Sequence, residues 1–168
     1  MNDFFLVYDR FVLVSGGQSG ADRAALDWAI ENGVRHGGWC PRGRRTEDGV
    51  LPDWYRLRET PASGYLARTE RNVRDSDATL IFTLSDTLDG GSKRTADFAD
   101  KLGRPWLHVR PGVHPKFVAR FLNQRAVVTL NVAGKRESSA PGIGKLVLDV
   151  LGAALRVQRE GIDPVEQA

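Results

Sequence analysis

The sequence predicts a single α/β domain in which a parallel sheet carries helices on both faces. Apolar runs of strand length alternate along the chain with segments whose apolar residues recur at helical spacing. Parallel neighbouring strands require a crossover connection, so this alternation favours a parallel sheet. The length of 168 residues matches one ordinary domain. We place that domain at residues 11–159, between an apolar N-terminal segment at 1–10 and a frayed tail at 160–168.

The first unit of the domain is a strand, a glycine turn and a helix. The apolar run Phe11–Val14 ends at a pair of glycines, and helical spacing then continues to Gly33, which provides a stop. Residues 34–64 are rich in Gly, Pro and Arg, so we expect mostly loop there, with at most a short strand near Gly38–Cys40. A loop of this length in a small domain is usually functional.

The second half of the chain repeats the strand, glycine and helix pattern. A helix at Tyr65–Arg74 leads into a strand at Ala78–Leu84, and Gly90-Gly91-Ser92 then opens a helix from about Lys93 to Leu102. The same patterns predict a strand at Trp106–Val109, a short helix at Phe117–Leu122 and a strand at Ala126–Asn131. They then predict a loop at Ala133–Pro141 and a final helix at Ile143–Leu155.

Composition and charge exclude several classes of protein. The 24 basic and 21 acidic residues leave a formal charge of +3, which is too mild to indicate nucleic acid as a partner. The four tryptophans are scattered and form no stacking stripe of the kind that single-stranded nucleic-acid binders use. Nucleic acid is therefore disfavoured, and the excess of arginine over lysine suits binding of small anions.

The sequence shows neither a membrane-spanning segment nor a secretory signal, and this bears on the expected localisation. No apolar run approaches the ~20 residues that a membrane-spanning helix needs, so we expect no membrane association. Acidic residues in the first ten positions argue against a secretory signal. The single cysteine, Cys40, excludes a disulfide framework. We therefore expect a cytoplasmic protein.

Two glycine turns carry the strongest chemical signal. Glycine allows the backbone to approach an anion, and the free N–H groups of a helix start favour negative charge. The turn Ser15–Arg23 and the turn Gly90–Thr95 both follow strands, whose carboxyl ends share one edge of a parallel sheet. A purely geometric role for the glycines remains open, as does a capping role for Ser92 and Thr95 and a dipole-stabilising role for Asp22.

Other candidate residues have weaker support. Arg42 lies in a loop without apolar periodicity and is our candidate for an anion clamp, although Glu47 and Asp48 could equally pair with the arginines of that loop. Asp97, in the first turn of a helix, could be a general acid or base or simply a solvated residue. Cys40 lacks the partners of a tetrahedral site, so we expect no metal site.

The motifs together resemble those of the family named putative molybdenum carrier proteins. The resemblance covers roughly residues 11 to 155. It rests on the segments Ser15-Gly16-Gly17-Gln18-Ser19-Gly20-Ala21-Asp22-Arg23, Gly37-Gly38-Trp39-Cys40-Pro41-Arg42, Arg68-Thr69-Glu70-Arg71-Asn72-Val73-Arg74-Asp75-Ser76-Asp77, Gly90-Gly91-Ser92 and Asn131-Val132-Ala133-Gly134-Lys135-Arg136-Glu137-Ser138.

The resemblance implies a Rossmann-like fold, often oligomeric, whose algal members are described as binding molybdenum cofactor, a phosphorylated pterin dithiolene. The wider superfamily is similar to nucleotide-sensing domains, to DNA-processing protein A and to phosphoribohydrolases once labelled lysine decarboxylases. Those hydrolases carry P-G-G-x-G-T-x-x-E after a strand. Here Lys93 and Arg94 replace the Gly and Thr, and the shorter Asp97 holds the acid position. These departures favour binding over hydrolysis.

We therefore expect a carrier of an anionic phosphorylated ligand, either molybdenum cofactor or a related pterin or nucleotide. A nucleoside monophosphate phosphoribohydrolase is the alternative, with Asp97 or Glu70 assisting departure of the base. The apolar residues Phe4–Tyr8 need cover, and the last helix has a wide apolar face. Both features favour a homo-oligomer, either a dimer or a tetramer, and the alternative is that the N-terminal segment packs within its own chain. The predicted ligand contacts are Ser15, Gly16, Gly17, Gln18, Ser19, Gly20, Asp22, Arg23, Arg42, Arg68, Asn72, Gly90, Gly91, Ser92, Thr95, Asn131 and Gly134.

Overall fold

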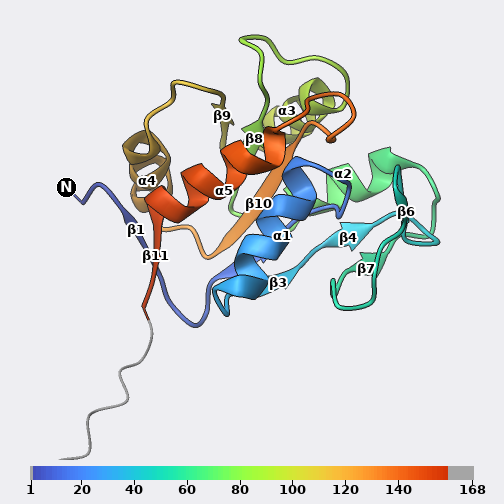
Figure 1. The fold of residues 1–168 in the computed structure, drawn as a ribbon, viewed down its shortest axis with the longest axis horizontal. Helices are drawn as coiled ribbons and strands as arrows, with labels where there is room; N and C mark the ends of the chain where they lie inside the picture. The colour runs from blue at the N-terminus through green and yellow to red at the C-terminus, as the bar shows by residue number, and fades with distance from the viewer. Residues whose placement is uncertain (1, 159–168) are drawn as a thin grey trace, which may run out of the picture.

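A computed structural model describes residues 2–158 of the chain and shows the predicted α/β fold (Figure 1). The predicted tail at 160–168 and the last residue of the predicted domain, Arg159, lie outside the described residues. One parallel sheet of five strands forms the centre of the molecule. Its strands, in spatial order, are β3 (Arg35–Gly37), β2 (Val12–Val14), β10 (Thr129–Gly134), β8 (Ala78–Phe82) and β9 (Trp106–Val109).

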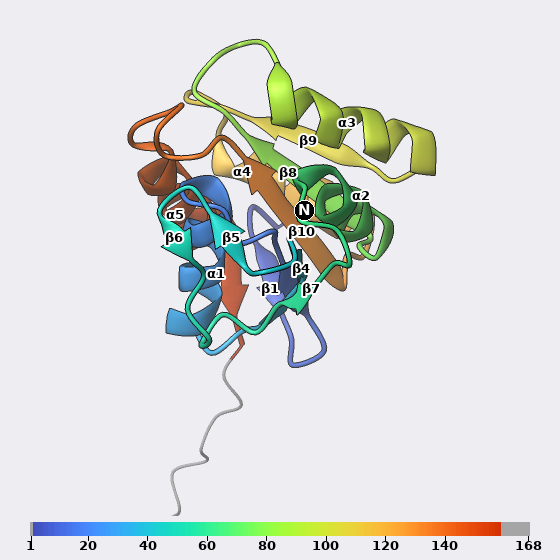
Figure 2. The same ribbon diagram turned by 90° about the vertical axis from the view of Figure 1, so that its right-hand side faces the viewer.

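Helices cover both faces of the sheet. Figure 2 shows one pair on each side of β10, with α1 and α5 on one face and α2 and α3 on the other. A further helix, α4, packs against α5. None of the helices within residues 2–158 is long and apolar enough to cross a bilayer. Their bounds are α1 (Ala21–Glu31), α2 (Tyr65–Arg74), α3 (Gly90–Leu102), α4 (Pro115–Gln124) and α5 (Ile143–Ala154).

Several element boundaries differ from those predicted; β8 ends at Phe82 and β10 extends to Gly134, and two of the differences lie at element starts. The strand predicted at 126–131 begins at Thr129, because the Asp77 carboxylate accepts the backbone N–H groups of Val128 and Thr129 at 2.9 and 2.8 Å and holds the chain in a turn before the strand. The helix predicted from Lys93 begins at Gly90. Gly90, Gly91 and Ser92 are therefore the first turn of α3 and do not precede it.

The region 34–64 contains more regular structure than the sequence predicts. Its first strand, β3, has the sequence Arg-His-Gly and pairs with β2 at the edge of the main sheet. Polar, half-exposed residues at an edge show no apolar pattern, which is why this strand was missed. Two small pairs follow: β4 (Trp39–Cys40) with β7 (Arg58–Glu59), and β5 (Arg45–Thr46) with β6 (Gly49–Val50).

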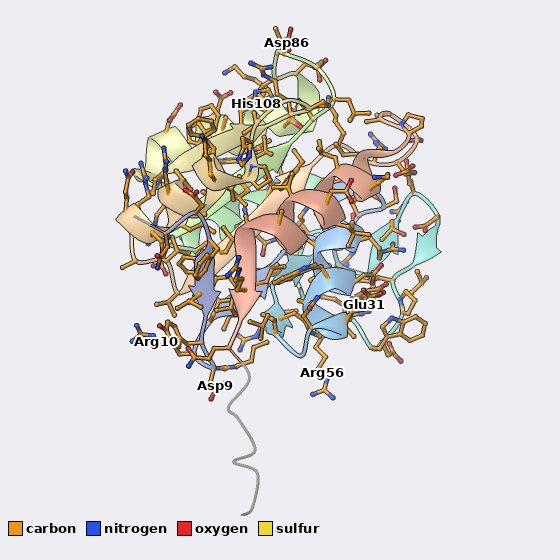
Figure 3. The ribbon with its side chains drawn as sticks, turned by 60° about the vertical axis from the view of Figure 1, so that its left-hand side comes forward. Asp9, Arg10, Glu31, Arg56, Asp86 and His108 are labelled. Atoms are coloured by element: carbon orange, nitrogen blue, oxygen red, sulfur yellow. The ribbon has the colours of Figure 1, made fainter. Side chains whose placement is uncertain are left out.

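The apolar N-terminal segment is covered by its own chain. Residues Phe5–Val7 form β1, which pairs in parallel with β11 (Leu155–Val157) directly after α5. Figure 3 shows the two strands side by side, with Asp9 and Arg10 in the turn that follows β1. Phe5 and Val7 are 7% and 2% exposed. The N-terminal segment therefore packs within its own chain and gives no support to the expected oligomer.

Truncation of Phe5 is expected to destabilise the fold. Its ring is buried and packs on Phe11 at a centroid distance of 5.7 Å, so Phe5→Ala should lower the free energy of unfolding by about 3 kcal/mol. Val50 is 72% exposed, and Val50→Ala should change it by less than about 0.5 kcal/mol. Urea denaturation measures both, and equal small effects would show that β1 adds nothing to the core.

Candidate functional site

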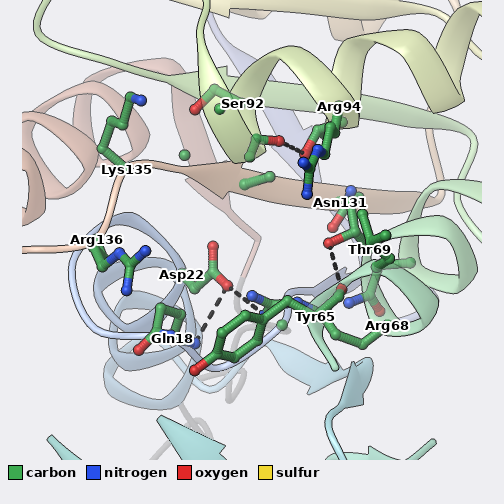
Figure 4. A pocket seen from close by; sticks show the side chains of 18 of the residues that line it. Gln18, Asp22, Tyr65, Arg68, Thr69, Ser92, Arg94, Asn131, Lys135 and Arg136 are labelled. Atoms are coloured by element: carbon green, nitrogen blue, oxygen red, sulfur yellow. Dashed lines mark hydrogen bonds and ion pairs between the residues drawn. The ribbon is translucent and has the colours of Figure 1, made fainter. Parts of the chain in front are cut away.

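A pocket of about 290 Å³ opens at the carboxyl ends of the parallel strands (Figure 4). It lies among the starts of α1, α2 and α3 and the end of β10, where the topology predicts a ligand site. Eleven of the predicted contacts line it: Gly16, Gln18, Asp22, Arg68, Asn72, Gly90, Gly91, Ser92, Thr95, Asn131 and Gly134. The two glycine turns and the end of β10 therefore do meet at one edge.

Six predicted contacts do not line the pocket. Ser15 is buried beneath it and donates its hydroxyl to the Val132 carbonyl at 2.6 Å. Gly17 has a φ of 78°, and a Cβ placed there would lie 2.7 Å from Leu51, so it faces the loop that follows β6. The others outside the pocket are Ser19, Gly20, Arg23 and Arg42.

Arg42 is exposed and does not form the predicted clamp over the pocket. Its backbone N–H donates to the Ala62 carbonyl at 3.0 Å. Its neighbour Arg44 has a structural role. The Arg44 guanidinium donates to four backbone carbonyls at 2.7–3.3 Å, those of Leu51, Pro52, Tyr55 and Leu57. These hydrogen bonds hold the long loop together.

The acidic residues of the loop pair across the fold and not with the arginines of their own loop. Asp48 binds the Arg23 guanidinium through both carboxylate oxygens, at 3.1 and 3.2 Å. Glu47 accepts hydrogen bonds from Ser19 and Ser138 and lies 3.9 Å from Arg136. These contacts tie the β5–β6 hairpin to the pocket rim.

The contacts of Glu47 make this attachment sensitive to acid. Hydrogen bonds from Ser138 and Ser19 hold the pKa of Glu47 below its ordinary value. Because the folded pKa lies below the unfolded one, the stabilisation is present above the unfolded value and is lost as the pH falls through the folded pKa. We expect an NMR titration of the side-chain carboxyl to report a depressed pKa in the wild type. Titration at or above the ordinary value would show that the hairpin is not held this way.

A buried ion pair forms the floor of the pocket. Arg68 Nη1 lies 3.1 Å from Asp22 Oδ2, and the two side chains are 11% and 7% exposed. Asp22 Oδ2 also accepts the backbone N–H of Gln18 at 3.3 Å. Burial raises the pKa of Asp22, and the adjacent Arg68 opposes that shift. This pair joins α1 to α2 directly below the glycine turn, since a Cβ at Gly16 would overlap the Arg68 guanidinium.

The start of α3 presents hydrogen-bond donors to the pocket. The N–H groups of its first three residues, Gly90, Gly91 and Ser92, have no partner within the helix. Ser92 is 3% exposed, and its Oγ forms no hydrogen bond with any residue among 2–158. A buried hydroxyl without a partner costs stability, so the arrangement points to a polar group supplied from outside.

Three cationic side chains line the pocket together with this helix start. Lys135 pairs with Asp89, the residue before α3, and Arg136 faces Glu47 across the rim. Arg94 projects from α3 and has no carboxylate partner among the described residues. These three were not among the residues predicted from the sequence, and neither were five other lining residues, Tyr65, Leu66, Thr69, Ala133 and Ser139. The basic pair Lys135-Arg136 directly after a strand was the signal available for two of them.

Asn72 lines the pocket and also holds the edge of the fold. Its amide oxygen accepts the backbone N–H of Trp39 at 2.8 Å, and its amide nitrogen donates to the Trp39 carbonyl at 3.0 Å. The Arg71 guanidinium stacks 4.7 Å from the Trp39 ring. Asn72 thus fastens β4 to α2.

The two acids named for a hydrolase lie away from the pocket. Asp97 is exposed and pairs with Lys93 one turn earlier on α3, and Glu70 is exposed on α2. Within residues 2–158, no three His, Cys, Asp or Glu side chains group as metal ligands. Cys40 is buried, and burial raises the pKa of its thiol.

Comparison with known proteins identifies the family. Residues 13–155 match the model of the circularly permutated YpsA SLOG family. The chain belongs to that family. This SLOG-family chain is also 41% identical to a crystal structure described as a putative molybdenum carrier protein from Syntrophus aciditrophicus SB. The match covers 84% of this chain and 92% of the other, with a TM-score of 0.81. The resemblance drawn from the motifs is confirmed, and a binding or carrier role in general is supported.

Two further comparisons add no argument for this SLOG-family chain. An (E)-4-hydroxy-3-methyl-but-2-enyl diphosphate reductase matches 84% of this chain and 59% of its own, at 11% identity and a TM-score of 0.39. That similarity is too low to bear on fold or activity. No curated protein matches the sequence.

Proposed function

We propose that this protein binds a small phosphorylated ligand in the pocket, either molybdenum cofactor or a related pterin or nucleotide. The observation that carries the proposal is the Ser92 hydroxyl, buried and without a partner among the described residues, in the first turn of α3. A phosphate there would accept its proton and the free N–H groups of Gly90 and Gly91. Lys135 and Arg94 would balance its charge.

The rest of the pocket suits a planar group attached to the phosphate. Tyr65 is 42% exposed at its rim and offers an aromatic face. The volume of about 290 Å³ lies near the lower end of the range for small-molecule sites. The lining contains no thiol or histidine, so a molybdenum cofactor would be held through its pterin and phosphate, with the metal as cargo.

Ser92→Ala tests the proposal with two readouts. Removing an unpartnered buried hydroxyl should leave the free energy of unfolding unchanged or raise it, whereas affinity for pyrophosphate should fall about tenfold. Calorimetric titration measures the second effect. Ser85→Ala is the control, because that hydroxyl donates to the Thr87 carbonyl in an exposed loop. Unchanged affinity in Ser92→Ala would remove the start of α3 from the site.

The natural ligand requires a direct search. Native mass spectrometry of the freshly purified protein, followed by denaturing extraction, identifies a retained small molecule by its mass. We expect a phosphorylated pterin or nucleotide. Retention of a neutral or cationic compound in the pocket would contradict the proposal.

We also propose a cytoplasmic homo-oligomer. With β1 covered by β11, the support comes from exposed apolar side chains elsewhere, Leu148 on α5 and Phe117 on α4, which are 40% and 50% exposed. Light scattering at micromolar concentration measures the mass. A mass of one chain across the elution peak would overturn this part of the proposal.

A further inference from the structure

Asp22 has one carboxylate oxygen that the fold does not use. Oδ2 is occupied, because it accepts from the Gln18 backbone and from Arg68. The Ser15 hydroxyl lies close enough to lower the pKa of Asp22, but its proton is donated to the Val132 carbonyl, so among residues 2–158 no donor is directed at Oδ1. In Figure 4 Oδ1 points from the floor toward the centre of the pocket. A side chain that is 93% buried therefore presents a free acceptor to any ligand there.

The walls beside this oxygen suit a flat ligand. Gly90, Gly91 and Ala133 line the pocket and carry no side chain larger than a methyl group, and a Cβ at Gly91 would meet no atom within 4 Å. Tyr65 adds an aromatic face at the rim, with the Arg68 guanidinium 5.3 Å from its ring centroid. A planar ring can enter such a space edge first, and its edge then meets the floor where Asp22 lies.

We propose that Asp22 selects ligands whose ring carries adjacent N–H and NH2 donors, the 2-amino-4-oxopyrimidine edge that guanine and pterins share. The inference deepens the proposed function and rests on it. A charged oxygen with two free lone pairs accepts from two neighbouring donors at once. Adenine places an acceptor nitrogen beside its amino group, and that lone pair would repel the carboxylate. Arg68 is the positioning residue, because it holds Oδ2 and so fixes the direction of Oδ1.

A nucleotide series on the wild-type protein tests the selection directly. GMP carries both donors, IMP lacks the 2-amino group, and AMP presents the mismatched edge, whereas the sugar and phosphate are identical in all three. We expect calorimetry to give at least tenfold tighter binding of GMP than of AMP, with IMP between them. Equal affinities would overturn the inference and leave the phosphate site intact. If neither the nucleotides nor pyrophosphate bind, the proposed function fails as well.

Asp22→Asn provides a change of specificity that a structural role would not produce. The Gln18 N–H and Arg68 both donate toward Oδ2, so the asparagine oxygen should take that side and turn its NH2 group into the pocket. The pocket would then offer a donor where the wild type offers an acceptor. GMP affinity should fall at least tenfold, and AMP, whose ring nitrogen can accept from that NH2 group, should bind as well as GMP or better.

Asp22→Asn also distinguishes recognition of the base by Asp22 from recognition of the sugar. If Asp22 instead held a ribose hydroxyl, Asp22→Asn would weaken GMP and AMP by the same factor, and that result would overturn the inference. Asp149→Asn is the matched control, since that carboxylate is exposed on α5 and pairs with Lys145. Thermal melting checks that each variant is folded. If Asp22→Asn does not fold, the wild-type series with GMP, IMP and AMP decides the question.

Discussion

Gly91→Asp is expected to abolish anion binding while leaving the fold intact. Gly91 lines the pocket in the first turn of α3, has an ordinary φ, and a Cβ there would meet no atom within 4 Å. A negative charge in the first turn of a helix stabilises it by about 0.3–1 kcal/mol. The same charge lies where the phosphate must bind. At ~4 Å and an effective dielectric constant of ~20, repulsion costs about 4 kcal/mol, which corresponds to more than a hundredfold loss of affinity.

Two control variants separate charge from shape. Gly91→Asn adds a side chain of the same size without the charge, and it should weaken pyrophosphate binding far less than Gly91→Asp does. Gln124→Glu adds one negative charge at the far end of α4 and should leave affinity unchanged, because it lies outside the pocket. Titration calorimetry compares the three. If Gly91→Asp bound pyrophosphate as the wild type does, the anion site could not be at the start of α3.

Gly38→Ala is expected to cause the largest loss of stability. Gly38 has a φ of 123°, and a Cβ built there would lie 2.3 Å from the backbone oxygen of Ser15 and 2.9 Å from its nitrogen. Both obstacles are main-chain atoms at the end of β2, so no side chain can move aside. Strain and overlap together should lower the free energy of unfolding by about 3 to 5 kcal/mol.

Gly33→Ala is the matched control for this prediction. Gly33 also has a positive φ, 66°, but a Cβ there would meet nothing within 4 Å. The substitution should therefore cost only the conformational term, about 1 to 2 kcal/mol. Denaturant unfolding of both variants measures the difference. Equal losses would mean that the approach of Gly38 to Ser15 is not tight.

The site could be located from the sequence because its framework is built from local signals. Each glycine turn follows an apolar strand and opens a helix, and parallel strands bring such turns to one edge. Gly16, Gly90 and Gly91 do line the pocket at that edge, and their contact with a ligand stays a prediction. Arg42 was misplaced for the converse reason. It lies in a loop whose course depends on distant carbonyl and carboxylate partners, and those leave no periodic pattern in the sequence.

The sequence by itself determined the fold class, the order of the main helices and strands, the family and the edge of the sheet where the pocket lies. Apolar periodicity and the positions of glycines between elements are local features, so the sequence alone predicts the elements from them. Only the tertiary structure decided that β1 pairs with β11, that Asp22 joins Arg68, and that the Ser92 hydroxyl is buried without a partner among the described residues. These are contacts between residues far apart in the chain or consequences of burial, and packing alone determines them.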